Sequence, residues 1–365
     1  MRIAILGDAL DLQYAGVHMY LRGLLDALLK AGTENEYLLV RPKPGGEFGG
    51  VRELVVPIRP AIPGHQYWRA LTAIPQRLAR EKVDVVVEPA HFGPFNLPAG
   101  VKRITIIHDL TPVLFPRFHS LPSSIVHKIT LPGIMKRASY IIANSAHTKQ
   151  DLEQYYPAAV GKTHIVRPGV EAIFQPEQDG AVLRKYGIRQ PYLLFVGTLE
   201  PRKNLPALLR AYEKFRESGP ALQLVLAGRK GWKNESFFSA LEASPFRSDI
   251  VLTGYTGRHE LPVLYSMAKL FVYPSVYEGF GLPVLEAMAC GAPVLVSSTS
   301  SLPEVGGKAA QYFDPQDAGS FSKKLLELAR DDNKLREMGR QSLLQAGQFS
   351  WEAGARSFLA LLKNQ

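Results

Sequence analysis

The stretch "KLFVYPSVYEGFGLPVLEAMACGAPVLVSS", residues 269–298, joins a short apolar run, a loop with two glycines, an apolar helical pattern and a second apolar run. A strand, a helix and a further strand in this order form a unit in which the two strands lie parallel. The loop "VYEGFGL" then follows a strand that ends near Ser275, and Pro283 suits the first turn of the next helix. This stretch predicts an α/β fold.

The same alternation runs through nearly the whole chain, which predicts parallel sheets with helices on both faces. The expected strands are 2–7, 36–40, 83–90, 103–109, 139–145 and 163–169, then 192–198, 222–228, 249–255, 269–275, 292–298 and 310–315. The expected helices are 16–31, 65–81, 122–137 and 146–155, then 204–217, 235–243, 259–268, 283–290, 317–330 and 332–346.

A chain of 365 residues is too long for one ordinary hydrophobic core, so two domains are expected. The polar segment 169–191 interrupts the alternation, and its residues that break regular structure include Pro176, Gly180, Gly187 and Pro191. We place the connection between the domains there. Two α/β domains in tandem predict a cleft where the carboxyl ends of both sheets face each other.

Composition narrows the class of protein. Hydrophobic residues make up 46% and charged residues 21%, with a net charge of +10 and no dense Lys/Arg run. This favours anionic small molecules or an anionic membrane surface over nucleic acid. No apolar run approaches the roughly 20 residues of a membrane span, and the N-terminus lacks the features of a signal peptide. The single cysteine, Cys290, forms no disulfide within the chain and fits a reducing cytoplasm.

Two glutamates, Glu278 and Glu286, stand eight positions apart on either side of the glycine turn. Free N–H groups at such a helix start bind anions, phosphates especially. Carboxylates would repel a phosphate but accept hydrogen bonds from sugar and ribose hydroxyls, so they would hold the neutral parts of a ligand. Taken singly, each has a simpler explanation: Glu286 as a favourable charge in a first helical turn, and Glu278 as a surface loop charge.

An anionic ligand also requires cations. Arg202 and Lys203 follow the strand expected at 192–198 and precede a helix that begins near Asn204. At the carboxyl end of a strand they are candidates for neutralising a diphosphate. Such a pair is otherwise common as solvated surface charge, and Asn204 fits an ordinary helix cap.

Several signatures of other chemistries are missing from the sequence. It has no Asp-x-Asp and no cysteine or histidine cluster with metal-ligand spacing, so no metal and no cofactor is expected. It also lacks a G-x-G-x-x-G after the first strand and a G-x-x-x-x-G-K-[ST] motif, which disfavours a dehydrogenase and a P-loop nucleotidase.

These motifs together resemble family 4 of the glycosyltransferases, which are retaining enzymes of the GT-B architecture. The motif "EGFGLPVLEAMACGAPVLVS" contains the paired glutamates of that family. The stretches "FVGTLEPRKN" and "IIHDLTPVLFP" are similar to those of bacterial polysaccharide mannosyltransferases. The resemblance implies two Rossmann-like domains facing across a cleft, an acceptor-side domain at 1–175 and a nucleotide-sugar donor domain at 188–349. It also implies that the terminal helix, 350–365, packs back on the first domain.

The resemblance also implies roles for individual residues. Arg202 and Lys203 would bind the donor diphosphate, Glu286 the ribose hydroxyls and Glu278 the donor sugar. The amides of three residues in the turn would contact sugar and phosphate: Phe280, Gly281 and Leu282.

In the first domain, His108 ends a strand and would face the transferred sugar, although a lone histidine at a strand end is more often structural. Gly16, in "YAGVHMYLRGLL", would belong to a loop close to the donor phosphates, and Gly197 would also contact the donor. The chain departs from many members twice. Ala15 precedes Gly16 where two glycines are common, and Thr198 follows Gly197 where arginine is common, which leaves Arg202 to supply that charge.

The expected activity is transfer of a hexose, with mannose from GDP-mannose as the best guess, to a saccharide or lipid-linked saccharide hydroxyl without a metal. The anomeric configuration would be retained by attack on the same face, with Glu278 as a positioning group. The donor base stays open between guanine and uracil. The alternatives are a nucleotide-sugar hydrolase or epimerase on the same scaffold, and a non-catalytic nucleotide-sugar-binding subunit.

The acceptor is the least specified partner. Segment 111–140 mixes aromatic, apolar and basic residues beside the expected cleft. It fits contact with a lipid-linked acceptor at the inner membrane surface, or equally a long loop followed by an ordinary core-facing helix. The expected location is the cytoplasm, with peripheral contact at the inner membrane face as one possibility.

Overall fold

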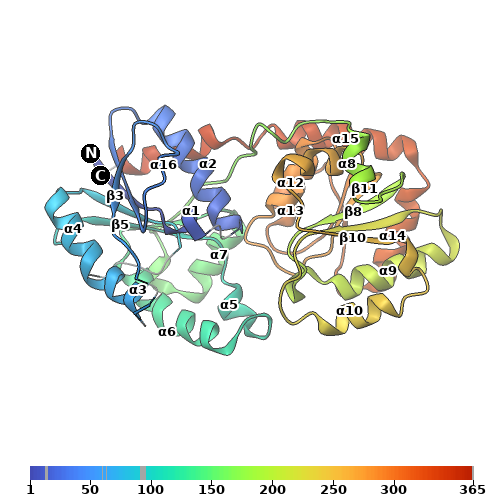
Figure 1. The fold of residues 1–365 in the computed structure, drawn as a ribbon, viewed down its shortest axis with the longest axis horizontal. Coiled ribbons are helices and arrows are strands. Elements are labelled where there is room, and N and C mark those ends of the chain that lie inside the picture. Colours follow the sequence, from blue (N-terminus) through green and yellow to red (C-terminus); the bar gives the residue numbers. More distant parts are fainter. Residues whose placement is uncertain (13–14, 60, 63, 91–95, 364–365) are drawn as a thin grey trace. The chain divides into compact units, whose positions relative to one another are not determined.

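The computed structural model describes residues 1–12, 15–59, 61–62, 64–90 and 96–363. It divides into two compact units (Figure 1). Unit 1 comprises Met1–Gly169 and Ser350–Gln365, and unit 2 comprises Val170–Phe349. In the part of the chain that the structure describes, no helix combines the length and the apolar character needed to cross a bilayer.

Among the described residues of unit 1, a seven-stranded parallel sheet has the order β3-β2-β1-β4-β5-β6-β7. Its strands are β1 Arg2–Leu6, β2 Glu36–Arg41, β3 Arg52–Val55, β4 Val85–Glu88, β5 Lys102–Ile107, β6 Tyr140–Ala143 and β7 Thr163–Ile165. Its helices are α1 Asp8–Leu12, α2 Ala15–Ala31, α3 His65–Trp68, the π-helical η1 Arg69–Ala73, α4 Ile74–Glu81, α5 Thr111–Leu114, α6 Leu121–Arg137, α7 Ala146–Tyr155 and α16 Trp351–Lys363.

Alternate side chains of the central strands enter different cores, as the period of a strand requires. Ile3 and Ile5 of β1 pack in one cluster, whereas Ala4 and Leu6 pack in another on the opposite face. The first of these clusters also contains Trp351 and Phe358 of α16. The terminal helix therefore completes the core of unit 1.

Among the described residues of unit 2, a six-stranded parallel sheet has the order β10-β9-β8-β11-β12-β13. Its strands are β8 Tyr192–Val196, β9 Gln223–Ala227, β10 Ile250–Gly254, β11 Leu270–Tyr273, β12 Val294–Ser297 and β13 Gln311–Phe313. Its helices are α8 Gly180–Lys185, α9 Leu205–Ser218, α10 Glu235–Glu242, α11 Leu261–Ser266, α12 Leu282–Ala289, α13 Leu302–Gly306, α14 Ala318–Ala329 and α15 Asp332–Ala346.

The strand order of unit 2 reverses between β8 and β11, and we call this place its switch point. The chain runs outward from β8 through β9 to β10, then returns to the other side of β8 with β11 and continues to β13. Connections on the two sides of such a point diverge, and open α/β sheets bind ligands in the resulting crevice at the carboxyl ends of their strands. The loops after β8 and β11 are therefore the candidates for a ligand site in this unit.

The expectation of one uninterrupted helix over 65–81 was wrong, because the segment is divided into α3, η1 and α4. Pro75, near the start of α4, has no N–H to donate to the preceding turn, and the π-helical turn lies directly before it. Strand β3 was missed because it is short and charged, as edge strands often are. The segment expected as a connection contains α8 and contributes Phe174, Leu183 and Ile188 to the core of unit 2.

Candidate active site

The loops that follow β8 and β11 are tied together by their backbones. The N–H of Val276 donates to the carbonyl of Arg202 at 3.0 Å, and the Ser275 hydroxyl contacts the same carbonyl at 3.2 Å. Arg202 and Lys203 form a short helical turn at the end of one loop, and Glu278 lies on the other. The structure therefore brings the two cations and the first glutamate together.

The carboxylate of Glu278 is the centre of this cluster and is only 6% exposed. Its Oε2 accepts a hydrogen bond from Nη1 of Arg202 at 2.7 Å. Its Oε1 accepts from three donors: Nζ of Lys203 at 2.6 Å, the Ser275 hydroxyl at 2.6 Å and the Tyr273 hydroxyl at 3.2 Å. Both oxygens are thus engaged and fixed in position.

The charges of the cluster depend on one another. Burial alone would raise the pKa of Glu278, but Arg202 and Lys203 lower that pKa to about 2. Burial and the neighbouring Arg202 lower the pKa of Lys203, against the opposing effect of Glu278. Arg202 also pairs with Glu200 at 2.8 Å, so two cations face two carboxylates inside the protein. The side chain of Arg202 is 18% exposed and that of Lys203 7%, which makes Arg202 the more accessible cation.

The glycine turn between the glutamates starts helix α12. Gly281 precedes the first residue of α12 and has φ of 107°, a backbone conformation that residues other than glycine rarely adopt. An added Cβ there would lie 2.8 Å from Leu302. Among the described residues, the amides of Phe280, Gly281 and Leu282 donate to no protein acceptor, as expected for a helix start. The turn can therefore offer N–H groups to an anion.

Two serines after β12 hold this turn, and sequence reasoning missed both because neither belongs to a motif. The amide of Glu278 donates to Oγ of Ser300 at 2.9 Å. The Ser301 hydroxyl contacts the carbonyls of Glu278 at 2.9 Å and Phe280 at 2.7 Å. Both serines therefore position the turn.

The second glutamate, Glu286, lies in a different cluster. It is 8% exposed, accepts from the Tyr265 hydroxyl at 3.0 Å and lies 3.5 Å from Nη2 of Arg258. Burial raises the pKa of Glu286 to about 7, although Arg258 and Tyr265 oppose that rise. Arg258 also binds both carboxylate oxygens of Glu171, at 2.7 and 3.1 Å. Sequence reasoning missed Arg258 and Tyr265 because neither belongs to a motif.

Gly197 directly follows β8, with φ of 152°. Its carbonyl oxygen would lie 1.9 Å from a Cβ at Gly228, so the loops after β8 and β9 meet where only glycine fits. Asn204 does not cap α9 through its side chain, because that side chain donates to the carbonyl of Pro315 at 3.3 Å. Asn204 therefore occupies the cap position of α9 as the sequence suggested, but without the side-chain hydrogen bond of an ordinary cap.

The remaining candidates lie in unit 1. His108 follows β5, and its Nε2 is 2.8 Å from the carbonyl oxygen of Pro89. Its ring packs edge-on against Tyr20 at 5.1 Å, and burial lowers the pKa of His108. Gly16 is exposed in the first turn of α2, at the start of the helix expected from residue 16, and not in the loop before it. Tyr14, from the same motif, lies outside the described residues.

Within the described ranges, no three or more His, Cys, Asp or Glu side chains are grouped so that they could hold a metal ion. The charged groups at the switch point of unit 2 are instead the ion pairs described above.

Comparison with known proteins places this geometry in a family. Residues 14–174 match the model for "Glycosyltransferase Family 4", and residues 182–344 match that for "Glycosyl transferases group 1". The chain is 36% identical over 269 residues to O-antigen chain mannosyltransferase B of Escherichia coli, covering 72% of this chain and 71% of that protein. The chain belongs to glycosyltransferase family 4.

A second relative of this family 4 transferase is much longer than the region that matches this chain. The serotype-specific mannosyltransferase WbdA of Escherichia coli is 32% identical over 259 residues, which cover 68% of this chain and 32% of WbdA. The match thus spans about a third of that relative.

Solved structures show that the family 4 transferase has the GT-B fold. Sucrose-phosphate synthase from Thermosynechococcus elongatus matches with a TM-score of 0.78 at 19% identity, covering 100% of this chain and 98% of that one. Anabaena Alr3699/HepE, in complex with UDP and glucose, matches with a TM-score of 0.74 at 17% identity, covering 100% of both chains.

Proposed function

We propose that this transferase moves mannose from GDP-mannose to a hydroxyl of a saccharide or lipid-linked saccharide, retaining the anomeric configuration and using no metal ion. The observation that carries the proposal is the cluster of Arg202, Lys203 and Glu278 beside the glycine turn at the switch point of unit 2. The names of the mannosyltransferase relatives support the choice of sugar.

Arg202 and the start of α12 are the groups proposed to bind the diphosphate. Arg202 is held by Glu200 and Glu278 yet keeps an exposed fraction of 18%, so a phosphate can reach it without rearrangement of its partners. As the glycosidic bond breaks, negative charge grows on the diphosphate. Donors that are already oriented stabilise this charge without reorganising. Lys203 is buried, so we propose that it holds Glu278 and adds positive potential at the site without touching the donor.

Glu278 is proposed to position the donor sugar. Retention in glycosidases commonly uses a carboxylate nucleophile. Here Oε1 already accepts from Lys203, Ser275 and Tyr273, while Oε2 accepts from Arg202. A carboxylate with both oxygens so engaged is a weak nucleophile, which supports attack by the acceptor on the same face. Glu286 is proposed to accept from the ribose hydroxyls, and His108 to contact the transferred sugar.

The surface of α6 supports a lipid-linked acceptor and peripheral contact with a membrane. Leu121, Ile125 and Ile129 recur every four residues along this helix and are 75%, 55% and 72% exposed. No Asp or Glu occurs between Asp109 and Asp151, whereas this stretch contains five Lys or Arg residues. An apolar row among basic residues is the pattern of a helix that lies on an anionic bilayer.

The test is a transfer assay with the whole chain, radiolabelled GDP-mannose or UDP-glucose, and mannose-terminated oligosaccharides as acceptors. We expect mannosylated product from GDP-mannose, an α-linked anomer by NMR, and undiminished turnover in EDTA. Transfer from UDP-glucose alone would contradict the donor assignment, and a β-linked product would contradict retention. Free sugar or an epimer formed without acceptor would favour a hydrolase or epimerase.

A further inference from the structure

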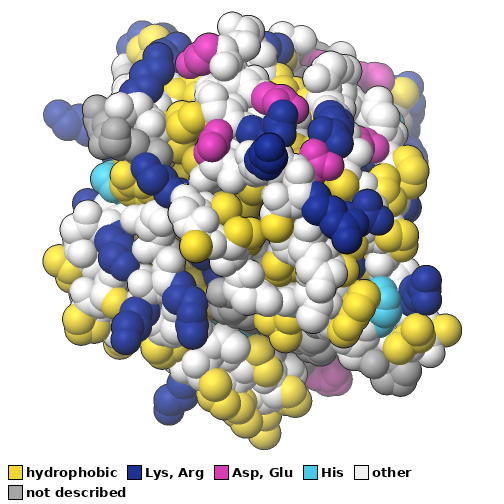
Figure 2. Space-filling model, turned by 90° about the vertical axis from the view of Figure 1, so that its left-hand side faces the viewer, with side chains coloured by type: hydrophobic (Ala, Val, Ile, Leu, Met, Phe, Trp, Pro, Cys, Tyr) yellow, Lys and Arg dark blue, Asp and Glu magenta, His cyan; other side chains and the backbone are white. Residues whose placement is uncertain are grey.

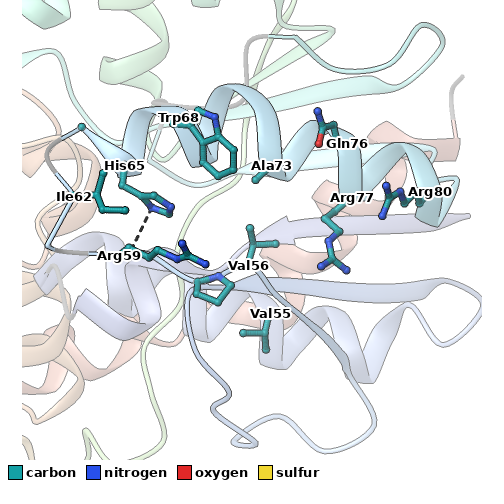
Figure 3. A pocket seen from close by; sticks show the side chains of 12 residues that line it. Val55, Val56, Arg59, Ile62, His65, Trp68, Ala73, Gln76, Arg77 and Arg80 are labelled. Atoms are coloured by element: carbon teal, nitrogen blue, oxygen red, sulfur yellow. Dashed lines mark hydrogen bonds between the residues drawn. The ribbon is translucent and has the colours of Figure 1, made fainter.

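A hollow of about 690 Å³ opens in unit 1 beside the edge strand β3 (Figure 3). One side is formed by Val55, Val56 and Pro57 at the carboxyl end of that strand. The helical segment α3–η1–α4 forms the other side, with His65 and Trp68 facing the hollow (Figure 3). It contains none of the residues assigned above to the donor, so it requires an explanation of its own.

Three arginines line this hollow: Arg59, Arg77 and Arg80. Figure 3 shows the guanidinium groups of Arg59 and Arg77 extending into it from opposite sides. No carboxylate among the described residues forms an ion pair with any of the three. The hollow therefore concentrates positive charge.

Some other arginines of the same unit are paired with carboxylates. They include Arg2, Arg41, Arg52, Arg69 and Arg103. All three arginines of the hollow are exposed, so water screens their mutual repulsion, but a bound anion would be attracted by all three charges. The planar guanidinium group, with its fixed donors, suits phosphate in particular.

The hollow also has an apolar side. Trp68 is 56% exposed and Ile62 is 48% exposed, and both line the opening. On the face in Figure 2, most acidic side chains gather in the upper part, while the lower part shows Lys and Arg among hydrophobic side chains. Arginines beside exposed tryptophan and isoleucine suit a phosphate that carries an apolar chain.

The helical wall is held in place by one buried arginine. Arg69 is 2% exposed, binds both carboxylate oxygens of Asp8 at 2.6 and 3.0 Å, and donates to the carbonyl of Val56. It begins the π-helical turn η1, directly after Trp68. Such turns are uncommon and occur frequently at functional sites. Arg69 thereby fixes the spacing between the two walls.

The hollow lies at the same edge of the sheet as His108. Val55 and Pro57 are at the carboxyl end of β3, and His108 is at the carboxyl end of β5, four strand positions away. With about 4.8 Å between neighbouring strands, the two ends are roughly 19 Å apart. A ligand held in the hollow by its phosphate must therefore extend along this edge to reach His108.

We propose that this hollow binds the diphosphate of a lipid-linked acceptor, while the acceptor's saccharide extends along the sheet edge towards His108. The proposal rests on the proposed function, because it names the acceptor class of the same enzyme. It assigns Arg59 and Arg77 to the phosphates, and Trp68 and Ile62 to the first part of the lipid chain.

The test compares two acceptors with the same oligosaccharide, one a dodecyl diphosphate ester and the other a neutral dodecyl glycoside. For the variant R59Q/R77Q we expect the KM of the diphosphate acceptor to rise at least tenfold, with kcat, the KM of the neutral acceptor and the KM of GDP-mannose unchanged. The matched control, R22Q/K30Q, removes two exposed cations of α2 that lie outside the hollow and should change none of these values. An equal rise for both acceptors, or no rise, would overturn the proposal.

A binding measurement separates this proposal from the proposed function. Dodecyl diphosphate is titrated into the whole chain in saturating GDP, which blocks the donor site, and R59Q/R77Q should lose this binding even if no mannose transfer is found. Unchanged binding would overturn the proposal. Binding to phosphatidylglycerol and phosphatidylcholine vesicles is measured as well. If R59Q/R77Q loses binding to phosphatidylglycerol vesicles alone and still binds dodecyl diphosphate, the hollow contacts bulk anionic lipid and the proposal is overturned.

Discussion

Lys203 and Glu278 form a buried ion pair, with 2.6 Å between Nζ and Oε1, that joins the loop after β8 to the loop after β11. The pair fixes the geometry at the point where the strand order of unit 2 reverses. Arg202, the residue before Lys203, is the more accessible of the two cations. The proposed function accordingly gives the two neighbouring cations different roles: Lys203 holds Glu278, and Arg202 binds the donor.

Replacing Lys203 by methionine should destabilise unit 2 strongly. The change leaves Glu278 buried without one of its two cations, and breaking a buried pair from one side typically costs about 3–5 kcal/mol. The measurement is urea denaturation followed by the fluorescence of Trp232, which lies in unit 2. The double variant K203M/E278Q should lose less than the sum of the two single variants, and additive losses would contradict the coupling.

Glu286 should make both stability and donor binding depend on pH. Burial raises its pKa from 4.5 to about 7, so the unfolded chain releases this proton first as the pH rises. The folded state therefore loses stability between pH 4.5 and 7, by about 3 kcal/mol at about 1.4 kcal/mol per pKa unit. E286Q should be more stable than the wild type above pH 7 and equally stable near pH 4.5, as measured by urea denaturation.

Ionisation of Glu286 should also change the KM of the donor. An ionised Glu286 is the better acceptor for ribose hydroxyls, so the KM of GDP-mannose should fall as the pH rises through about 7. E286Q should lose this dependence. A wild-type KM that stays constant across that range would contradict the role given to Glu286.

The order of the elements was largely predictable, because buried runs such as "VDVVVEPA" and "YLLFVGT" have the composition and length of parallel strands. Those runs also placed Arg202 and Glu278 at the carboxyl ends of strands. The order of strands within the sheet was not predictable. The sequence therefore did not show that β8 and β11 are neighbours, or that Arg202 pairs with Glu278, 76 positions away. Arg258, which approaches Glu286, and Arg69, which binds Asp8, carry no local signal because their partners are distant in sequence.

Gly281 should tolerate no side chain. G281A places a Cβ at φ of 107° and 2.8 Å from Leu302, so α12 must shift or the backbone must strain, at a cost of about 1–3 kcal/mol. We expect a lower melting temperature and a higher KM for GDP-mannose. The control is Gly16, where an added Cβ meets nothing within 4 Å in a helical turn, so G16A should keep or raise the melting temperature. A donor KM unchanged in G16A would remove Gly16 from the donor site.

His108 should act as a neutral group. Burial lowers its pKa, and if Nε2 carries the proton it donates to Pro89, which leaves Nδ1 as an acceptor. H108A should lower kcat about tenfold through loss of one hydrogen bond to the sugar, while the partly exposed His147 serves as the control in H147A. Equal turnover in both variants would make His108 a structural residue.

Turnover of R202Q with GDP-mannose tests the central claim most directly, because Arg202 is accessible and its loss leaves Lys203 on Glu278. The control is R340Q, which removes an exposed arginine of α15. We predict a loss in kcat of about 10²–10³ for R202Q, since one preorganised donor contributes that much to stabilising developing charge. R202Q also leaves Glu200 and Glu278 without one of their partners, so its melting temperature should fall, and turnover is measured at a temperature at which circular dichroism shows the variant to be folded. Turnover of R202Q that equals that of R340Q would contradict the claim that this corner of unit 2 stabilises the leaving diphosphate.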